Sequence, residues 1–257
     1  MTKDRGQRTE DRVAHNGTPH LKRGLAATLL LFFAFCLFSS AWAAPPDSVQ
    51  LTYDVYKGSL RIGQIEESYS RNKERYTLAS TTRAVGLLAL FKRGKILISS
   101  SGLVGANGLQ PLSFSDQREG EEKRNRSAEF DWETRQLTLI QRDQRASVAL
   151  PDGTQDRLSA MYQFMFLPLQ PAASLEFSMT NGGKLDNYRY TVSTGQKLAT
   201  PAGDFDTLYL DNQPKKGESR TEIWLTTSHH NLPCKMTITD PDGGQFTQIL
   251  SKISVTP

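Results

Sequence analysis

The chain has 257 residues, a formal net charge of +4 at pH 7 and a sequence-derived isoelectric point of about 9.0. Residues 1–43 hold six basic and three acidic side chains, so the 25 basic and 24 acidic residues of the rest leave it a net charge of +1. This near balance excludes the concentrated basic face that a nucleic-acid-binding protein needs. The densest charged cluster, Asp116–Arg126, mixes both signs and is typical of a solvated hairpin or loop.

The first 43 residues have the pattern of a secretory signal peptide. Lys22 and Arg23 precede Leu25–Phe38, an uncharged stretch of 14 residues, and Ala41–Ala43 (AWA) places small residues at the positions that a signal peptidase recognises. The apolar stretch is short for a membrane span, and an uncleaved anchor is the alternative interpretation. The sequence therefore predicts cleavage near Ala43 and export to the periplasm.

The remaining residues, 44–257, alternate between apolar and polar in short segments about ten residues apart, with Gly, Asn, Asp and Pro between them. This pattern predicts a single, mostly β domain: an antiparallel meander of about a dozen strands, sandwich or barrel-like. Segments with clear alternation are SVQLTYDVY (48–56), LRIGQIEESYS (60–70), RYTLASTTRA (75–84), NYRYTVST (187–194) and RTEIWLTT (220–227).

One segment that breaks the β pattern is RAVGLLALFKRGK, residues 83–95. Its apolar cluster, which includes Leu87 and Phe91, is bounded by Arg83 on one side and by three basic residues on the other. We expect a short helix that covers an open end of the barrel. The alternative is an exposed apolar tip with a basic collar that contacts a membrane or lipid head groups.

A second segment, residues 155–169, has the apolar spacing of one face of an α-helix. The apolar positions are Leu158, Met161, Tyr162, Met165, Phe166 and Leu169. We expect the helix to be capped by Thr154 or Asp156 and to end at Pro168. The stripe predicts a helix that fills the inside of a curved sheet as core, and a wall that contacts a ligand is the alternative. Four polar residues are interpreted as caps and a surface pair, or as a polar rim if the stripe faces a cavity: Gln155, Asp156, Arg157 and Ser159.

Motifs for catalysis are lacking in the sequence, which has no nucleophile elbow, phosphate-binding loop or HExxH zinc motif. His229 and His230 are adjacent in a predicted loop, and Cys234 follows four residues later, so a metal site or a histidine-dependent hydrolase has little support. Cys234 is interpreted as a buried structural thiol, with a reactive thiol as the alternative. We expect no enzyme activity, no metal and no cofactor.

The part of the chain from Tyr53 to Ile253 resembles a family of proteobacterial periplasmic proteins grouped only as a domain of unknown function. The motifs that carry the resemblance are Thr82–Leu87, Gly108–Pro111, Phe130–Trp132, Leu150-Pro151, Gln155–Ser159 (QDRLS), Thr200–Phe205, Trp224-Leu225, Leu232-Pro233 and Asp242-Gly243. Cys234 departs from the pattern, in which an aliphatic residue follows the Leu-Pro pair. The resemblance implies an antiparallel β-spiral or open barrel with a helix packed inside, similar in outline to periplasmic proteins that maintain the cell envelope or handle lipids.

These observations favour a non-enzymatic periplasmic protein that supports the cell envelope by binding an apolar or amphiphilic ligand or an envelope protein. The expected ligand contacts are Arg83, Leu87, Phe91, Leu158, Met161, Tyr162, Met165 and Phe166. In this hypothesis Arg83 binds an anionic head group. The alternatives are a scaffold or assembly factor that acts through strand edges or the apolar tip, and a hydrolase that uses His229 or His230. The sequence indicates no oligomeric state.

Overall fold

The computed structural model describes residues 44–86, 88–91, 94–142 and 144–257, and residues 44–257 form one compact unit. The signal peptide predicted for residues 1–43 lies outside the described residues. The prediction of a mostly β, antiparallel, open-barrel-like fold is confirmed, with 17 strands in the described part of the chain.

The strands are β1 (Ser48–Lys57), β2 (Leu60–Asn72), β3 (Arg75–Ala84), β4 (Ile96–Gly105), β5 (Gly108–Arg118), β6 (Arg126–Asp131), β7 (Gln136–Gln141), β8 (Gln144–Ala149), β9 (Gln155–Asp156), β10 (Ser174–Thr180), β11 (Leu185–Thr194), β12 (Leu198–Thr200), β13 (Gly203–Phe205), β14 (Thr207–Asp211), β15 (Arg220–Thr226), β16 (Pro233–Thr239) and β17 (Gln245–Thr256). The helical elements are α2 (Leu88–Phe91), α3 (Ser159–Gln163) and the 3-10 helices η1 (Glu122–Arg124) and η2 (Phe164–Phe166).

Fifteen strands form one sheet in the order β8-β7-β6-β5-β4-β3-β2-β1-β17-β16-β15-β14-β11-β10-β9, and β12 and β13 form a separate hairpin. Every pair in the large sheet is antiparallel except β9 with β10. The first and last long strands are neighbours, because β1 pairs with β17 from Ser48 opposite Thr256 to Lys57 opposite Phe246. The two edges of the sheet, β8 and β9, are not hydrogen-bonded to each other, so the barrel is open.

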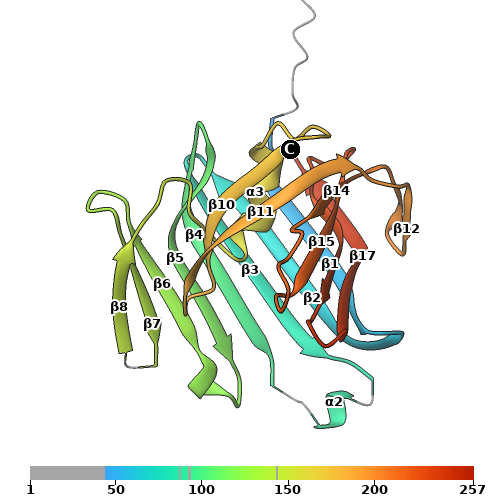
Figure 1. Ribbon diagram of the computed structural model, residues 1–257, viewed down its shortest axis with the longest axis horizontal. Coiled ribbons are helices and arrows are strands. Elements are labelled where there is room, and N and C mark those ends of the chain that lie inside the picture. The colour runs from blue at the N-terminus through green and yellow to red at the C-terminus, as the bar shows by residue number, and fades with distance from the viewer. Residues whose placement is uncertain (1–43, 87, 92–93, 143) are drawn as a thin grey trace, which may run out of the picture. The chain divides into compact units, whose positions relative to one another are not determined.

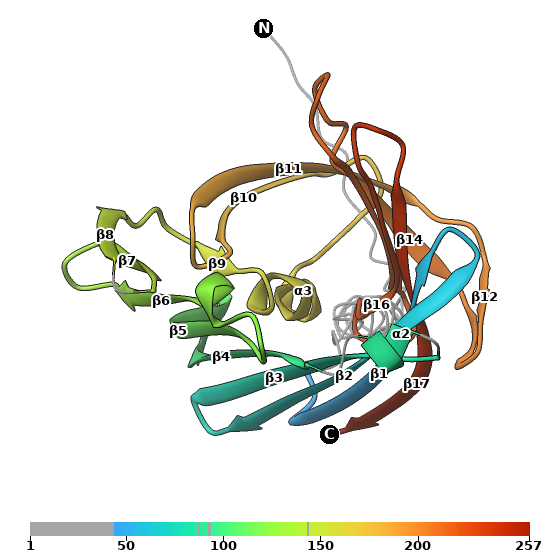
Figure 2. The same cartoon turned by 90° about the horizontal axis from the view of Figure 1, so that it is seen from below.

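The sheet curls into a ring that surrounds α3, and β6, β7 and β8 project from the ring as a flap (Figures 1 and 2). Side chains along each strand alternate between the two faces of the sheet, so every second one points into the ring. In β1, these inward side chains are Val49, Leu51 and Tyr53, which are buried. Bulges bend the strands further. In β4, the register shifts between Ser101 and Gly102, where a Cβ atom would overlap the carbonyl of the adjacent strand β5.

The predicted helix at residues 155–169 is shorter than expected. Gln155 and Asp156 pair with β10 as β9, and the backbone N–H of Arg157 donates to the Thr180 carbonyl, so α3 begins only at Ser159. At the other end, Leu167 is extended because the residue before a proline avoids the helical region. The expected short helix at residues 83–95 is present as α2, at the end of the ring away from α3 (Figure 1).

Candidate functional site

Asp156, whose side chain is fully buried, holds the start of α3 in place through hydrogen bonds. Its Oδ1 accepts hydrogen bonds from the backbone N–H groups of Leu158 (2.9 Å) and Ser159 (2.8 Å), and its own N–H donates to Ser159 Oγ. The hydroxyl of Ser100 on β4 donates to Asp156 Oδ2 at 2.5 Å. Burial raises the pKa of Asp156, while the hydrogen bonds lower it. The N-cap residue of α3 is Leu158 rather than Thr154 or Asp156, but the Asp156 carboxylate binds the N–H groups at the start of the helix from two positions earlier and ties the helix to the sheet.

Two glutamines join α3 to β5 at the point where the barrel is open. Gln155 Nε2 donates to the Leu109 carbonyl (2.9 Å), and Gln163 Oε1 accepts from the Leu109 N–H (2.7 Å). Strand β6 pairs with β5 only from Ser113 to Asp116, so Leu109 lies beyond that pairing. These side chains therefore supply partners that a neighbouring strand would otherwise provide. The β9–α3 segment closes the ring without completing the sheet.

The apolar face of α3 lies mostly in the core. Leu158, Tyr162 and Met165 are buried, and the Tyr162 ring stacks on Tyr69 with 5.8 Å between the ring centroids. The core in contact with this face includes Val49, Leu51, Tyr53, Tyr76, Leu78, Leu109, Trp224, Leu232, Cys234 and Leu250. This burial favours core packing over ligand contact for the three residues.

Other predicted contacts are less enclosed. Met161 and Phe166 are half-buried and pack against the edge of the core. The predicted polar rim is wrong for Gln155, Asp156 and Ser159, because all three are buried and hold the start of α3 in place. Of the four predicted rim residues, only Arg157 is partly exposed. Gln155 and Asp156 are buried where β9 pairs with β10, and their side chains contact Leu109 on β5 and Ser100 on β4.

Glu67 is a functional candidate that the sequence analysis missed. It lies on the inner face of β2 in phase with Ile65 and Tyr69, and its carboxylate accepts hydrogen bonds from Tyr162 Oη and Ser80 Oγ, both at 3.2 Å. Burial raises the pKa of Glu67 to about 7, against the opposing effect of these hydrogen bonds. The signal in the sequence was an acidic residue at an inward position of an alternating strand.

A hollow of about 410 Å³ opens at the end of the ring where α2 lies. Its apolar lining is Val55, Ile62, Ala84, Leu88 and Ile96, and its charged lining is Arg83, Lys95, Arg118, Glu119, Glu121 and Arg124. Arg83, predicted to bind an anionic head group, lies here, but its Nη2 is 2.6 Å from Glu66 Oε2 and the two side chains are about equally exposed. Leu87 and the side chain of Phe91, also predicted at this site, lie outside the described residues.

A smaller hollow of about 190 Å³ lies between the end of α3 and β10. Gln155, Ala160, Phe164 and Phe177 contribute to its walls. The Oε1 atom of Gln155 is buried and accepts no hydrogen bond from any described residue.

The histidines and the cysteine give no support to a catalytic or metal site. His229 Nδ1 is 2.9 Å from the hydroxyl of the adjacent Ser228, and its ring packs edge-on against Phe205. No carboxylate in the described ranges is hydrogen-bonded to either histidine ring, and no group of three metal-ligating side chains converges there. Cys234 is fully buried, and burial raises its pKa to about 12. It donates to the Trp224 carbonyl and packs as a small core residue.

None of the helices described is both long and apolar enough to cross a bilayer.

Comparison with solved structures supports the fold. A β-barrel-like protein with a DUF1849 domain from Brucella abortus is 13% identical, with a TM-score of 0.54; the match covers 84% of this chain and all of that one. A candidate lipoprotein from Parabacteroides distasonis (9% identical, TM-score 0.36) and a candidate exported protein from Bacteroides fragilis (10% identical, TM-score 0.32) each match 82% of this chain and 97% of their own. The TM-score of the Brucella protein indicates a shared fold and nothing about function.

No curated protein matches the sequence. Residues 52–251 match the model of a family described as DUF3108, protein of unknown function, and this match covers most of the chain. The expectation of a family grouped only by unknown function is therefore confirmed, and the chain belongs to the DUF3108 family.

Proposed function

We propose that this protein is a non-enzymatic periplasmic protein that supports the cell envelope by binding an amphiphilic ligand at the end of the ring where α2 lies. The observation that carries the proposal is the hollow of about 410 Å³, which has apolar walls and a charged margin. Binding sites for small amphiphiles combine these two features, because the chain leaves water while the head group keeps polar partners.

The exposed apolar side chains support the same end of the molecule. Of the five large apolar residues that are exposed in the described ranges, four lie beside the turns at this end: Leu60, Leu88, Leu97 and Phe246. Strand register brings Leu60 and Phe246 together, because Lys57 at the end of β1 is opposite both, whereas Leu97 is the second residue of β4 at the same end of the sheet. Exposed apolar side chains near the charged margin of the hollow are typical of a surface that meets lipid or an apolar partner.

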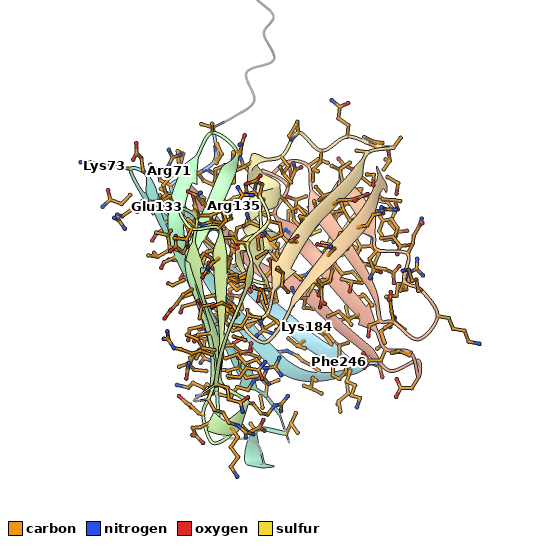
Figure 3. The ribbon with its side chains drawn as sticks, turned by 60° about the vertical axis from the view of Figure 1, so that its left-hand side comes forward. Arg71, Lys73, Glu133, Arg135, Lys184 and Phe246 are labelled. Carbon is orange, nitrogen blue, oxygen red and sulfur yellow. The ribbon has the colours of Figure 1, made fainter. Side chains whose placement is uncertain are left out.

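The opposite end of the ring has a different character. The turns there carry charged residues that project into solvent, among them Arg71, Lys73, Glu133 and Arg135 (Figure 3). The contrast between the two ends gives a ligand one apolar entrance. Export to the periplasm rests on the signal-peptide pattern of residues 1–43.

Native mass spectrometry of protein purified without detergent tests the proposal. We expect a recurrent extra mass that is released on denaturation and extracts into organic solvent. Ala84→Trp places a large ring in the hollow and should remove the extra mass. Ala79→Trp is the matched control, because Ala79 lies exposed on the outer face of the same strand. An unliganded mass for the unmodified protein, or an extra mass that Ala84→Trp leaves unchanged, would refute binding in this hollow.

A second candidate function is a scaffold that pairs with another protein through β8. All six residues of β8 are exposed, and its outer edge has no neighbouring strand in the sheet. Such an edge can accept an added strand from a partner. Replacing Ala146 and Val148 with lysine should then prevent crosslinking to an envelope protein, since edge lysines oppose strand pairing. Unchanged crosslinking would exclude this edge as the contact.

A further inference from the structure

Three arginines gather around one buried carboxylate beside the hollow. Asp116 on the inner face of β5 is 4% exposed; its Oδ2 accepts a hydrogen bond from Arg118 Nη2 at 3.3 Å and forms an ion pair with Arg157 Nη2 at 3.1 Å. Arg126 is directly opposite Asp116 in the pairing of β5 with β6. Two other carboxylates among the described residues interact with the charge of Arg157: Asp156, which already accepts three hydrogen bonds, and Glu67.

The guanidinium groups of Arg118 and Arg157 each keep a hydrogen-bond donor that has no acceptor among the described residues. The Nε–H groups of Arg118 and Arg157 are buried, and so is the Oδ1 atom of Asp116; none of these three atoms has a hydrogen-bond partner among the described residues. Each arginine approaches Asp116 through a single nitrogen, whereas a fully engaged arginine–carboxylate pair is bidentate. A buried donor without an acceptor is costly, so this arrangement is suited to an incoming acceptor.

Charge points the same way. Three guanidinium groups face Asp116 and Asp156, and the carboxylate of Glu67 also acts on Arg157, so the cluster has one positive charge in excess while Glu67 is protonated, below its pKa of about 7. Burial lowers the pKa of Arg157, and the charges of Arg118 and Arg126 lower it further, whereas Asp116 and Asp156 raise it. An added anion would relieve the repulsion among the arginines.

The cluster is continuous with the hollow. Arg118 is part of the hollow's lining, and its side chain is 19% exposed, while Arg157 is 33% exposed at the start of α3. The other basic side chains of the lining differ, because Arg83 and Arg124 already pair with Glu66 and Glu121 at 2.6 Å and Lys95 is exposed to solvent.

We propose that Arg118 and Arg157 bind the phosphate or carboxylate head group of an anionic amphiphile whose apolar chain lies in the hollow beside α2. This inference rests on the amphiphile-binding function proposed above and adds the class of head group. It moves the head-group contact from Arg83 to a pair of arginines with unused donors.

Calorimetric titration with three probes tests the assignment: dodecyl phosphate and dodecyl maltoside, both below their critical micelle concentrations, and inorganic phosphate. We expect dodecyl phosphate to bind about tenfold more tightly than the maltoside, because only a charged acceptor satisfies the arginine donors. Arg118→Gln should abolish this preference. Arg124→Gln is the control, since Arg124 lines the same hollow but is exposed and paired with Glu121.

A variant with the opposite expected effect separates binding from folding. Asp116→Asn removes the competing carboxylate, so dodecyl phosphate should bind more tightly, even if thermal unfolding shows a loss of stability. If Asp116→Asn and Arg118→Gln both weaken binding in proportion to their loss of stability, the cluster is structural and the inference is refuted.

The three probes also separate the inference from the proposed function. Equal binding of both dodecyl compounds would refute the head-group site and leave amphiphile binding intact. No binding of either compound would refute both proposals. Inorganic phosphate that binds as tightly as dodecyl phosphate would identify a site for the free anion and refute the amphiphile.

Discussion

Glu67 makes the stability of this protein depend on pH in a direction that can be measured. Its carboxylate lies inside the ring, where burial raises its pKa from 4.5 to about 7. The folded protein therefore binds this proton more tightly than the unfolded chain does. The resulting stabilisation is fully present below pH 4.5 and is lost as the pH rises through about 7.

The size of the effect follows from the same two values. At about 1.4 kcal/mol for each pKa unit, a rise from 4.5 to about 7 corresponds to about 3 kcal/mol of unfolding free energy. Tyr162 and Ser80 donate to different oxygens of Glu67, so Glu67→Gln keeps an acceptor for one hydroxyl, can donate its amide N–H to the other, and cannot ionise. The variant should therefore gain about 3 kcal/mol relative to the unmodified protein between pH 4.5 and about pH 7.5.

Urea unfolding at a series of pH values, followed by circular dichroism, measures this difference. Glu66→Gln is the matched control, because Glu66 is the adjacent residue on the outer face and forms an exposed ion pair with Arg83. Loss of that pair should change stability by no more than about 1 kcal/mol. A stability difference between Glu67→Gln and the unmodified protein that stays constant from pH 4.5 to 7.5 would refute the reasoning.

Three further predictions concern the contacts of α3 and the buried thiol. Asp156→Ala should lower the unfolding free energy by about 2–4 kcal/mol, because it removes the hydrogen bonds at the start of the helix and the Ser100 bond, whereas Asp156→Asn should cost less in the same urea experiment. Met165→Ala should cost about 2–5 kcal/mol, and Met161→Ala, at a half-buried position, should cost less; equal losses would contradict the observed burial. Cys234 should react with a thiol reagent only after denaturation, and rapid reaction of the folded protein at pH 8 would contradict its burial.

Local patterns explain what the sequence could predict. Period-two alternation identified strands such as Ser48–Lys57, and helical spacing located an apolar helix near residue 160. The bounds of that helix could not be predicted, because β9 forms only through pairing with Met179 and Thr180 on β10. Pairing partners so distant in the chain leave no trace in local spacing.

The charged cluster Asp116–Arg126 illustrates the same limit. Its composition predicted a solvated hairpin, and the structure does place a turn between β5 and β6 there. However, Asp116 is buried, because Arg157 reaches it from a segment about forty residues later in the chain. Glu67 was missed for a similar reason: its partner Tyr162 is 95 residues away.

The role of α3 follows from how its residues are used. Leu158, Tyr162 and Met165 fill the core, and Gln155 and Asp156 hold the two sides of the ring together, so this helix has little surface left for a ligand. The segment before it, however, brings Arg157 to Asp116, which also pairs with Arg118 in the lining of the hollow. The helix therefore fills the inside of the ring, and the residue two positions before its start adds a positive charge beside Arg118. A ligand bound beside α2 would place its apolar chain against the apolar walls of the hollow and its anionic end against Arg118 and Arg157.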